Sequence, residues 1–163
     1  MKVGIIIHSF TGHTYSVGES IKIELEKENN IVELKKIDII GGEVRDEINI
    51  ARINFTEVIN PDDYDVLVFG GPVRGFSISP ALKSYLVGLQ KLKNKPVFIF
   101  VTHYFPLKSM GGTSAIKQIK VVCENHEANI IGTGIIDWKN GRRNSQILKL
   151  TEEIKKAIEK INK

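Results

Sequence analysis

The sequence has few of the features that mark proteins outside the ordinary globular classes. Its single cysteine, Cys123, has no partner for a disulfide within the chain, which fits a reducing compartment. Apolar runs such as residues 97–101 are much shorter than a membrane span. The first residues begin a strand pattern at once, without the basic region or cleavage site of a signal peptide. We therefore expect a cytoplasmic protein that has no membrane partner.

Several signatures of nucleotide and catalytic sites are also missing. The phosphate-loop pattern GxxxxGK[ST] does not occur, and the pair Gly132 and Gly134 lacks the third glycine of GxGxxG. The segment after the first apolar run contains neither the cysteine of a low-molecular-weight phosphatase nor the acidic residues of a phosphate-accepting receiver domain. His8, His13 and His103 do not combine with carboxylates at metal-ligand spacing, so we expect no metal site.

The charge and length are those of one moderately basic domain. The chain has 163 residues, enough for one domain over residues 1–163 with a sizeable core. Lys and Arg number 23 against 19 Asp and Glu, which gives a net charge of +4. No arginine-rich stripe with interleaved aromatic residues is present, so we expect no nucleic-acid partner. A mild positive field favours an acidic partner or an anionic substrate.

Strand and helix patterns alternate along the chain. Short apolar runs rich in β-branched residues predict buried strands at 2–8, 65–71, 96–102 and 129–136, and the more alternating 31–37 suits an edge strand. Helical periodicity lies between them, at 14–28, 80–92, 112–127 and 144–161, with a weaker pattern at 43–58. About five β-α repeats indicate an α/β fold built on a doubly wound parallel sheet. Ligands of such sheets bind beyond the carboxyl ends of the strands.

The segment after the first predicted strand, SFTGHT at 9–14, is rich in hydroxyl groups and precedes a helix. Ser9, Thr11 and Thr14 can donate hydrogen bonds, and Gly12 allows a ligand to approach the backbone closely. Such a loop binds a phosphate without any lysine. The alternative is that one of these hydroxyl groups simply caps the helix, and the loop alone does not decide between the two.

Two further loops concentrate unusual residues at the same edge of the predicted sheet. GGPVRGF at 70–76 follows the third strand, and THYFPLKSMGG at 102–112 follows the fourth. The second of these places two aromatic residues, Tyr104 and Phe105, where polar side chains are usual. Aromatic residues there indicate a flat, apolar ligand surface, and a local packing cluster is the alternative.

These three loops, in this order and at this spacing along nearly the whole chain, resemble the flavodoxin family. The resemblance implies a flavodoxin-like three-layer sandwich, whose five-stranded parallel sheet has the order 2-1-3-4-5. It also implies a bound FMN, with the phosphate at the first loop and the ring between the other two. The residues that match the cofactor site are Ser9, Thr11, Gly12, His13, Thr14, Pro72, Val73, Arg74, Gly75, Phe76, Thr102, His103, Tyr104, Phe105, Met110, Gly111 and Gly112.

The chain departs from the family pattern in two respects. Flavodoxins are usually acidic, whereas this chain is basic, and Arg74 and Phe76 stand where Trp, Tyr or Met often flanks the ring. We expect an electron carrier that passes electrons between redox partner proteins, as a monomer or a dimer. The alternatives are an NAD(P)H-dependent FMN or quinone reductase of the same fold, and an interaction module with an empty site.

Overall fold

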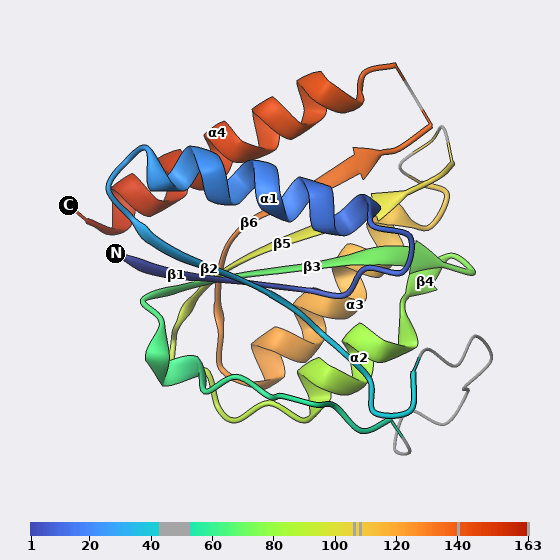
Figure 1. Ribbon diagram of the computed structural model, residues 1–163, viewed down its shortest axis with the longest axis horizontal. Helices are drawn as coiled ribbons and strands as arrows, with labels where there is room; N and C mark the ends of the chain where they lie inside the picture. The colour runs from blue at the N-terminus through green and yellow to red at the C-terminus, as the bar shows by residue number, and fades with distance from the viewer. Residues whose placement is uncertain (43–52, 106, 108, 140, 163) are drawn as a thin grey trace.

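The structure is a computed structural model that describes residues 1–42, 53–105, 107, 109–139 and 141–162. One sheet is sandwiched between two layers of helices (Figure 1). The strands are β1 (Lys2–Ile7), β2 (Ile31–Lys36), β3 (Val66–Arg74), β4 (Ser77–Ile78), β5 (Pro96–His103) and β6 (Asn129–Asp137). The helices are α1 (His13–Glu26), α2 (Pro80–Val87), α3 (Gly112–Asn125) and α4 (Arg143–Ile161), and Pro61–Asp63 form one short 3-10 turn.

Five strands pair in parallel in the order β2-β1-β3-β5-β6, which confirms the predicted flavodoxin-like arrangement. The chain runs from β1 outward to β2 and then crosses back to place β3 on the other side of β1. Strand order therefore reverses between β1 and β3. In an open parallel sheet, this reversal opens a crevice at the carboxyl ends of the two strands.

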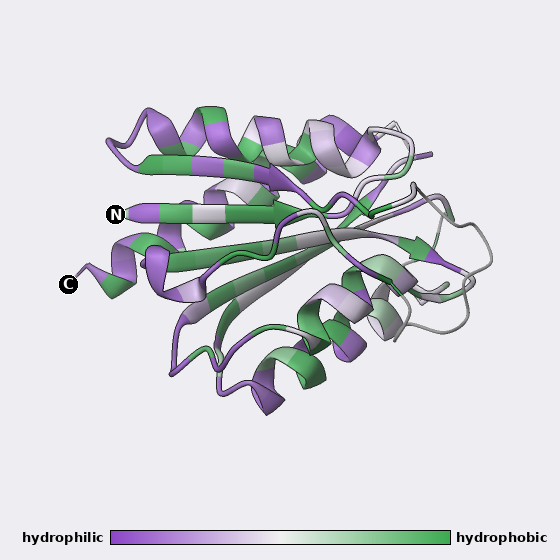
Figure 2. Cartoon of the chain, turned by 60° about the horizontal axis from the view of Figure 1, so that its bottom comes forward, coloured by the Kyte–Doolittle hydropathy of each residue, from purple (hydrophilic) through white to green (hydrophobic). Residues whose placement is uncertain are grey.

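The continuous apolar runs are buried on both faces of the sheet, as predicted. In β3, Val66 and Val68 belong to the core beneath α1 and α4, whereas Leu67 and Phe69 belong to the core beneath α2 and α3. Side chains alternate between the faces because the strand repeat is two residues. Figure 2 shows mostly apolar strands between helices in which hydrophilic and hydrophobic residues alternate.

The structure corrects three details of the predicted elements. The predicted loop at 70–76 begins as strand, because β3 continues to Arg74 and folds back through β4 as a small antiparallel hairpin. Helix α2 ends at Val87 rather than at residue 92, since Gly88 closes it. The weak helical pattern at 43–58 lies largely outside the described residues, and Phe55 pairs with Ile39 in an antiparallel bridge instead of continuing a helix.

Two glycines of β6 let its neighbours pack directly onto the strand. A Cβ at Gly132 would lie 2.3 Å from Phe98, and one at Gly134 would lie 2.3 Å from Leu150. Both distances are far shorter than any real contact of a Cβ atom. Glycine at these two positions therefore lets Phe98 and Leu150 pack against the backbone of the strand. Cys123 is also a packing residue, because it is buried in α3 and burial raises the pKa of its thiol to about 12. None of the described helices is long and apolar enough to cross a membrane.

Candidate functional site

A cavity of about 290 Å³ opens at the carboxyl edge of the sheet, over the point where strand order reverses. Its lining comes from the carboxyl ends of four parallel strands and from the residues that directly follow them. Its lining residues are Phe10, Thr11, His13, Thr14, Pro72, Val73, Arg74, Thr102, His103, Tyr104 and Trp138. The edge of the sheet thus brings together side chains that lie more than a hundred residues apart in the sequence.

The first loop leaves the start of α1 open toward this cavity. Gly12 is the N-cap at a left-handed φ of 87°, and its position has no side chain with which to cap the helix. Ser9 lies beneath the loop and accepts a hydrogen bond from the backbone N–H of Tyr15 at 3.2 Å. No described residue accepts a hydrogen bond from the backbone N–H of His13 or Thr14. One predicted hydroxyl therefore does cap the helix, while two N–H groups stay available to an anion.

A buried pair of hydroxyl groups joins the first loop to the middle of the sheet. The Oγ1 atoms of Thr14 and Thr102 are 2.9 Å apart, and both residues line the cavity. One hydroxyl donates to the other, so the acceptor of the pair keeps its own proton for another partner. Thr11 is exposed at the mouth of the cavity and adds a further hydroxyl.

One wall of the cavity is a stack of rings. The imidazole of His13 lies parallel to the indole of Trp138 with 4.1 Å between ring centroids, and it lies 5.9 Å from the ring of Tyr104. The guanidinium carbon of Arg143 is 4.5 Å from the Trp138 ring. Burial, and after it the positive charge of Arg143, lowers the pKa of His13. The wall therefore holds a neutral imidazole near neutral pH, with a cation beside it.

Another part of the wall comes from the end of β3. The guanidinium carbon of Arg74 lies 5.3 Å from the centre of the Phe10 ring, which is within cation–π range. Both residues line the cavity together with Pro72 and Val73. An aromatic ring therefore holds this arginine at the cavity wall.

The β3–β4 turn projects beside the cavity rather than into it. Gly75 and Phe76 both have positive φ, 53° and 63°, as the two-residue turn of a tight hairpin requires. A bulky residue rarely adopts this conformation. The Phe76 ring stacks on Phe105 at 5.3 Å, and a Cβ at Gly111 would lie 2.8 Å from the Phe76 Cα. Close packing from two sides thus holds the strained turn.

Buried polar residues lie below the rings, at the ends of the strands. The His8 Nδ1 atom is 2.9 Å from Ser79 Oγ, so His8 is the hydrogen-bonded packing residue that its position predicts. His103 pairs in register with Asp137, and both are buried. The Asp137 backbone N–H donates to Gln146 at 2.8 Å. His103 is the histidine of this layer that also lines the cavity.

The structure brings together nine of the residues that the flavodoxin pattern singles out, along the cavity wall. These are Thr11, His13, Thr14, Pro72, Val73, Arg74, Thr102, His103 and Tyr104. The others lie around it. Ser9 is buried under the first loop, and Gly12 is the N-cap of α1. Gly75, Phe76 and Phe105 are exposed outside the cavity. Gly112 begins α3 after its N-cap Gly111, and Met110 precedes the cap.

Sequence reasoning missed two lining residues, Phe10 and Trp138. Trp138 is the single tryptophan of the chain and directly follows β6. Its position is the signal that could have found it, because a residue directly after a parallel strand lies at the ligand edge of the sheet. Phe10 is an aromatic residue within the hydroxyl-rich loop itself. Both are aromatic residues in connections at this edge, as Tyr104 and Phe105 are.

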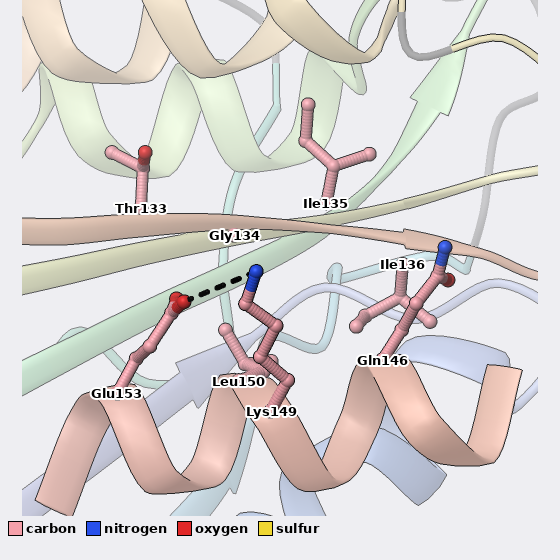
Figure 3. A pocket seen from close by; sticks show the side chains of 8 residues that line it. All are labelled: Thr133, Gly134, Ile135, Ile136, Gln146, Lys149, Leu150 and Glu153. Atoms are coloured by element: carbon pink, nitrogen blue, oxygen red, sulfur yellow. Dashed lines mark ion pairs between the residues drawn. The ribbon is translucent and has the colours of Figure 1, made fainter. Parts of the chain in front are cut away.

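A second hollow, of about 240 Å³, lies between β6 and α4 (Figure 3). Figure 3 shows Ile136 and Leu150 between the strand and the helix, while Thr133 and Ile135 point to the other side of β6. Lys149 and Glu153 form an ion pair across its mouth at 3.8 Å. Its lining combines aliphatic residues with a hydroxyl, an amide and this ion pair, a set that offers little chemistry. No cluster of three metal-binding side chains occurs among the described residues of the chain.

The sequence matches no known family profile and no curated protein. Its fold, in contrast, is similar to several solved structures. Two-electron reduced Megasphaera elsdenii flavodoxin is 20% identical, with a TM-score of 0.60 over 91% of this chain and 97% of that one. A flavoprotein in complex with FMN from Lactobacillus acidophilus is 18% identical, with a TM-score of 0.62 over 92% and 98%.

A third solved structure is also similar to this fold. The flavodoxin, WrbA-like protein from Agrobacterium tumefaciens is 16% identical, with a TM-score of 0.66 over 97% of this chain and 98% of that one. Similarity at this level of identity reports on the fold. Together with the strand order and the helix layers, it shows that this chain has the flavodoxin-like fold.

Proposed function

We propose that this protein binds FMN in the cavity at the carboxyl edge and passes electrons between redox partner proteins in the cytoplasm. One observation carries the proposal. The open N-terminus of α1 and a set of flat ring walls face the same cavity, where strand order reverses. The fold neighbours named flavodoxin and flavoprotein in complex with FMN support it.

The residues present fit a terminal phosphate. The backbone N–H groups of His13 and Thr14 are available, the helix start is positive, and Thr11 offers a hydroxyl. A Cβ at Gly12 would meet nothing within 4 Å, so the backbone is open to close approach. These groups would hold the phosphate, which carries about −1.5 to −2 charges at neutral pH.

The walls fit a planar ring. Tyr104 and Trp138 on one side and Arg74 with Phe10 on the other would flank it, and Thr102 at the base would offer a hydrogen bond. FMN supplies reversible transfer of one or two electrons, whereas the protein fixes the orientation of the ring and the surrounding charge. His103 and Asp137 add buried polar groups below the cavity.

Trp138 allows a direct test because it is the single tryptophan of the chain and lines the cavity. Titration of the apoprotein with FMN should quench its fluorescence, and FMN should bind more tightly than riboflavin or FAD. A bridging pyrophosphate suits an isolated helix start less well than a terminal phosphate does. Equal or tighter binding of FAD or riboflavin would contradict the proposed role of the first loop.

A second function, an NAD(P)H-dependent flavin or quinone reductase, is favoured by Arg74. Its guanidinium belongs to the cavity wall, and a permanent cation stabilises the negative charge that reduction adds to a flavin. A raised midpoint potential suits a hydride acceptor.

The two functions predict different results for Arg74. In a reductase, Arg74→Ala lowers the two-electron midpoint potential of the bound flavin by on the order of tens of millivolts. Arg74→Lys keeps the charge and serves as the control. The parent protein should then also oxidise NADH or NADPH. Unchanged potentials without NAD(P)H turnover would contradict the reductase and leave the carrier.

A further inference from the structure

Exposed aromatic side chains gather at one edge of the molecule. Of the large apolar residues that are exposed in the described part of the chain, four are aromatic, and all four surround the cavity mouth. They are Phe10, Phe76, Tyr104 and Phe105, of which Phe76 and Tyr104 are 54% and 59% exposed. Leu107, which is 60% exposed, lies in the same loop as Tyr104 and Phe105. Clustered exposed aromatic residues are typical of interaction surfaces.

Cations border this aromatic surface on two sides. The cationic rim consists of Arg74, Lys139, Arg142 and Arg143. Arg74 is held on Phe10 and Arg143 on Trp138, at 5.3 and 4.5 Å. Lys139 and Arg142 are exposed in the connection between β6 and α4. Because rings hold two of these head groups, less conformational freedom is lost when an anion binds them.

Among the described residues near this edge, the acidic ones that follow the parallel strands are buried or paired with lysines. In the described residues that follow β3, β5 and β6, the nearest acid is Asp137 at the end of β6, and it is buried. On the far side of the sheet, Asp38 pairs with Lys36 at 3.5 Å and Glu57 pairs with Lys35. As far as the described residues define it, the charge around the cavity mouth is therefore positive.

The apolar surface is wider than the cavity. Phe76, Phe105 and Leu107 do not belong to its lining, so a small molecule in the cavity leaves them exposed. Single-stranded nucleic acid needs a positive groove that follows its backbone, whereas these cations surround a compact apolar centre. An apolar centre with a charged border is the usual anatomy of a protein–protein interface.

We propose that this edge is the docking surface for a redox protein whose own contact surface is acidic. That this protein gives electrons to its partner rests on the proposed function, whereas the docking itself does not. Opposite charge steers the encounter, while Phe76, Tyr104 and Phe105 supply the area that is buried on contact. Docking there places the partner directly over the cavity mouth.

Cytochrome c provides a matched pair of probes, because succinylation replaces its lysine ammonium groups with carboxylates and leaves the haem in place. The FMN-loaded protein is reduced with dithionite and mixed with excess oxidant in a stopped-flow instrument. Two ferric haems each take one electron to become ferrous, the flavin returns to its oxidised form, and its protons go to the buffer. We expect the succinylated probe to react at least about tenfold faster at low salt, and added salt to reduce that advantage.

Two charge-matched variants locate the surface. Lys139→Gln/Arg142→Gln removes two exposed cations from the rim, and Lys156→Gln/Lys160→Gln removes two from the opposite end of α4. We expect the first to slow the succinylated probe by about threefold or more, and the second to leave it near the parent rate. Equal effects of the two variants, or a faster reaction with unmodified cytochrome c, would overturn the proposal.

A binding measurement separates this proposal from the proposed function. Fluorescence anisotropy follows labelled apoprotein as it binds ferric succinylated cytochrome c, unmodified cytochrome c or a single-stranded oligonucleotide. Salt-sensitive binding of the succinylated probe supports docking even if FMN fails to bind. Tighter binding of the oligonucleotide, or no binding of the acidic protein, overturns it.

Discussion

Two helices start at the same edge of the sheet, and their N-termini differ in what they leave open. A serine oxygen accepts a hydrogen bond from the third backbone N–H of each helix, that of Ser9 in α1 and that of Ser79 in α2. Helix α2 begins after Ser79, which is fully buried and accepts a hydrogen bond from the Leu82 backbone N–H at 3.4 Å. Pro80 occupies its first position, where proline has no N–H to satisfy. Helix α1 begins after Gly12, which has no side chain, and its first two N–H groups have no acceptor in the described structure.

This difference is the one that we expect between a purely structural helix start and one that also binds an anion. Backbone N–H groups without a partner are costly when they are shut away from water, so a buried helix start needs a cap. The start of α2 lies inside the protein and is capped there. The start of α1 opens to a cavity, where water or an anion can complete it. Within the hydroxyl-rich segment before α1, Ser9 thus caps the helix, whereas Thr11 faces the cavity and stays available to a ligand.

Removing the cap of α2 should have the largest effect. Ser79→Ala deprives the Leu82 N–H of its acceptor and breaks the bond to His8, so we expect a loss of about 2–3 kcal/mol in unfolding free energy. Urea denaturation of the apoprotein measures it. Ser145→Ala, at the exposed start of α4, is the control and should change stability by less than about 0.5 kcal/mol. A loss no larger than that of the control would show that the buried cap is unimportant.

Closing the start of α1 with a negative charge should affect binding rather than stability. Gly12→Asp places a carboxylate at the open terminus, in space where a Cβ meets nothing, and aspartate tolerates positive φ better than most residues. We expect FMN affinity to fall by at least about tenfold, or 1.4 kcal/mol, because two anions then compete for one site.

Two comparisons isolate the charge in this experiment. Gly12→Asn has nearly the same shape without the charge, so it should keep most of the affinity. Riboflavin, which lacks the phosphate, should bind Gly12→Asp and the parent equally well. If riboflavin lost as much affinity as FMN, the phosphate would not lie at the start of α1.

The sequence was sufficient to predict the sheet and the contributions of β1, β3 and β5 to the cavity, but not that of Trp138 after β6, because the predicted parts depend on local patterns. Buried parallel strands require continuous apolar runs, and parallel strands bring their following loops to one edge. The bond between Thr14 and Thr102 had no such signal, since it joins residues 88 positions apart. The turn at Phe76 contradicts local preference, because packing from Gly111 and Phe105 compensates for its positive φ.

The smallest effect concerns pH and the ring stack beside the open helix start. Burial and Arg143 lower the pKa of His13 below its usual 6.5, so the folded protein binds fewer protons than the unfolded chain just below that pH. Stability from this residue is therefore present above pH 6.5 and is lost as pH falls through the lowered folded pKa. His13→Asn removes this contribution, whereas His8 and His103 remain in both proteins. The difference in unfolding free energy between parent and variant should grow from about pH 5.5 to about pH 7.5. A constant difference would mean that only the stacking on Trp138 is lost.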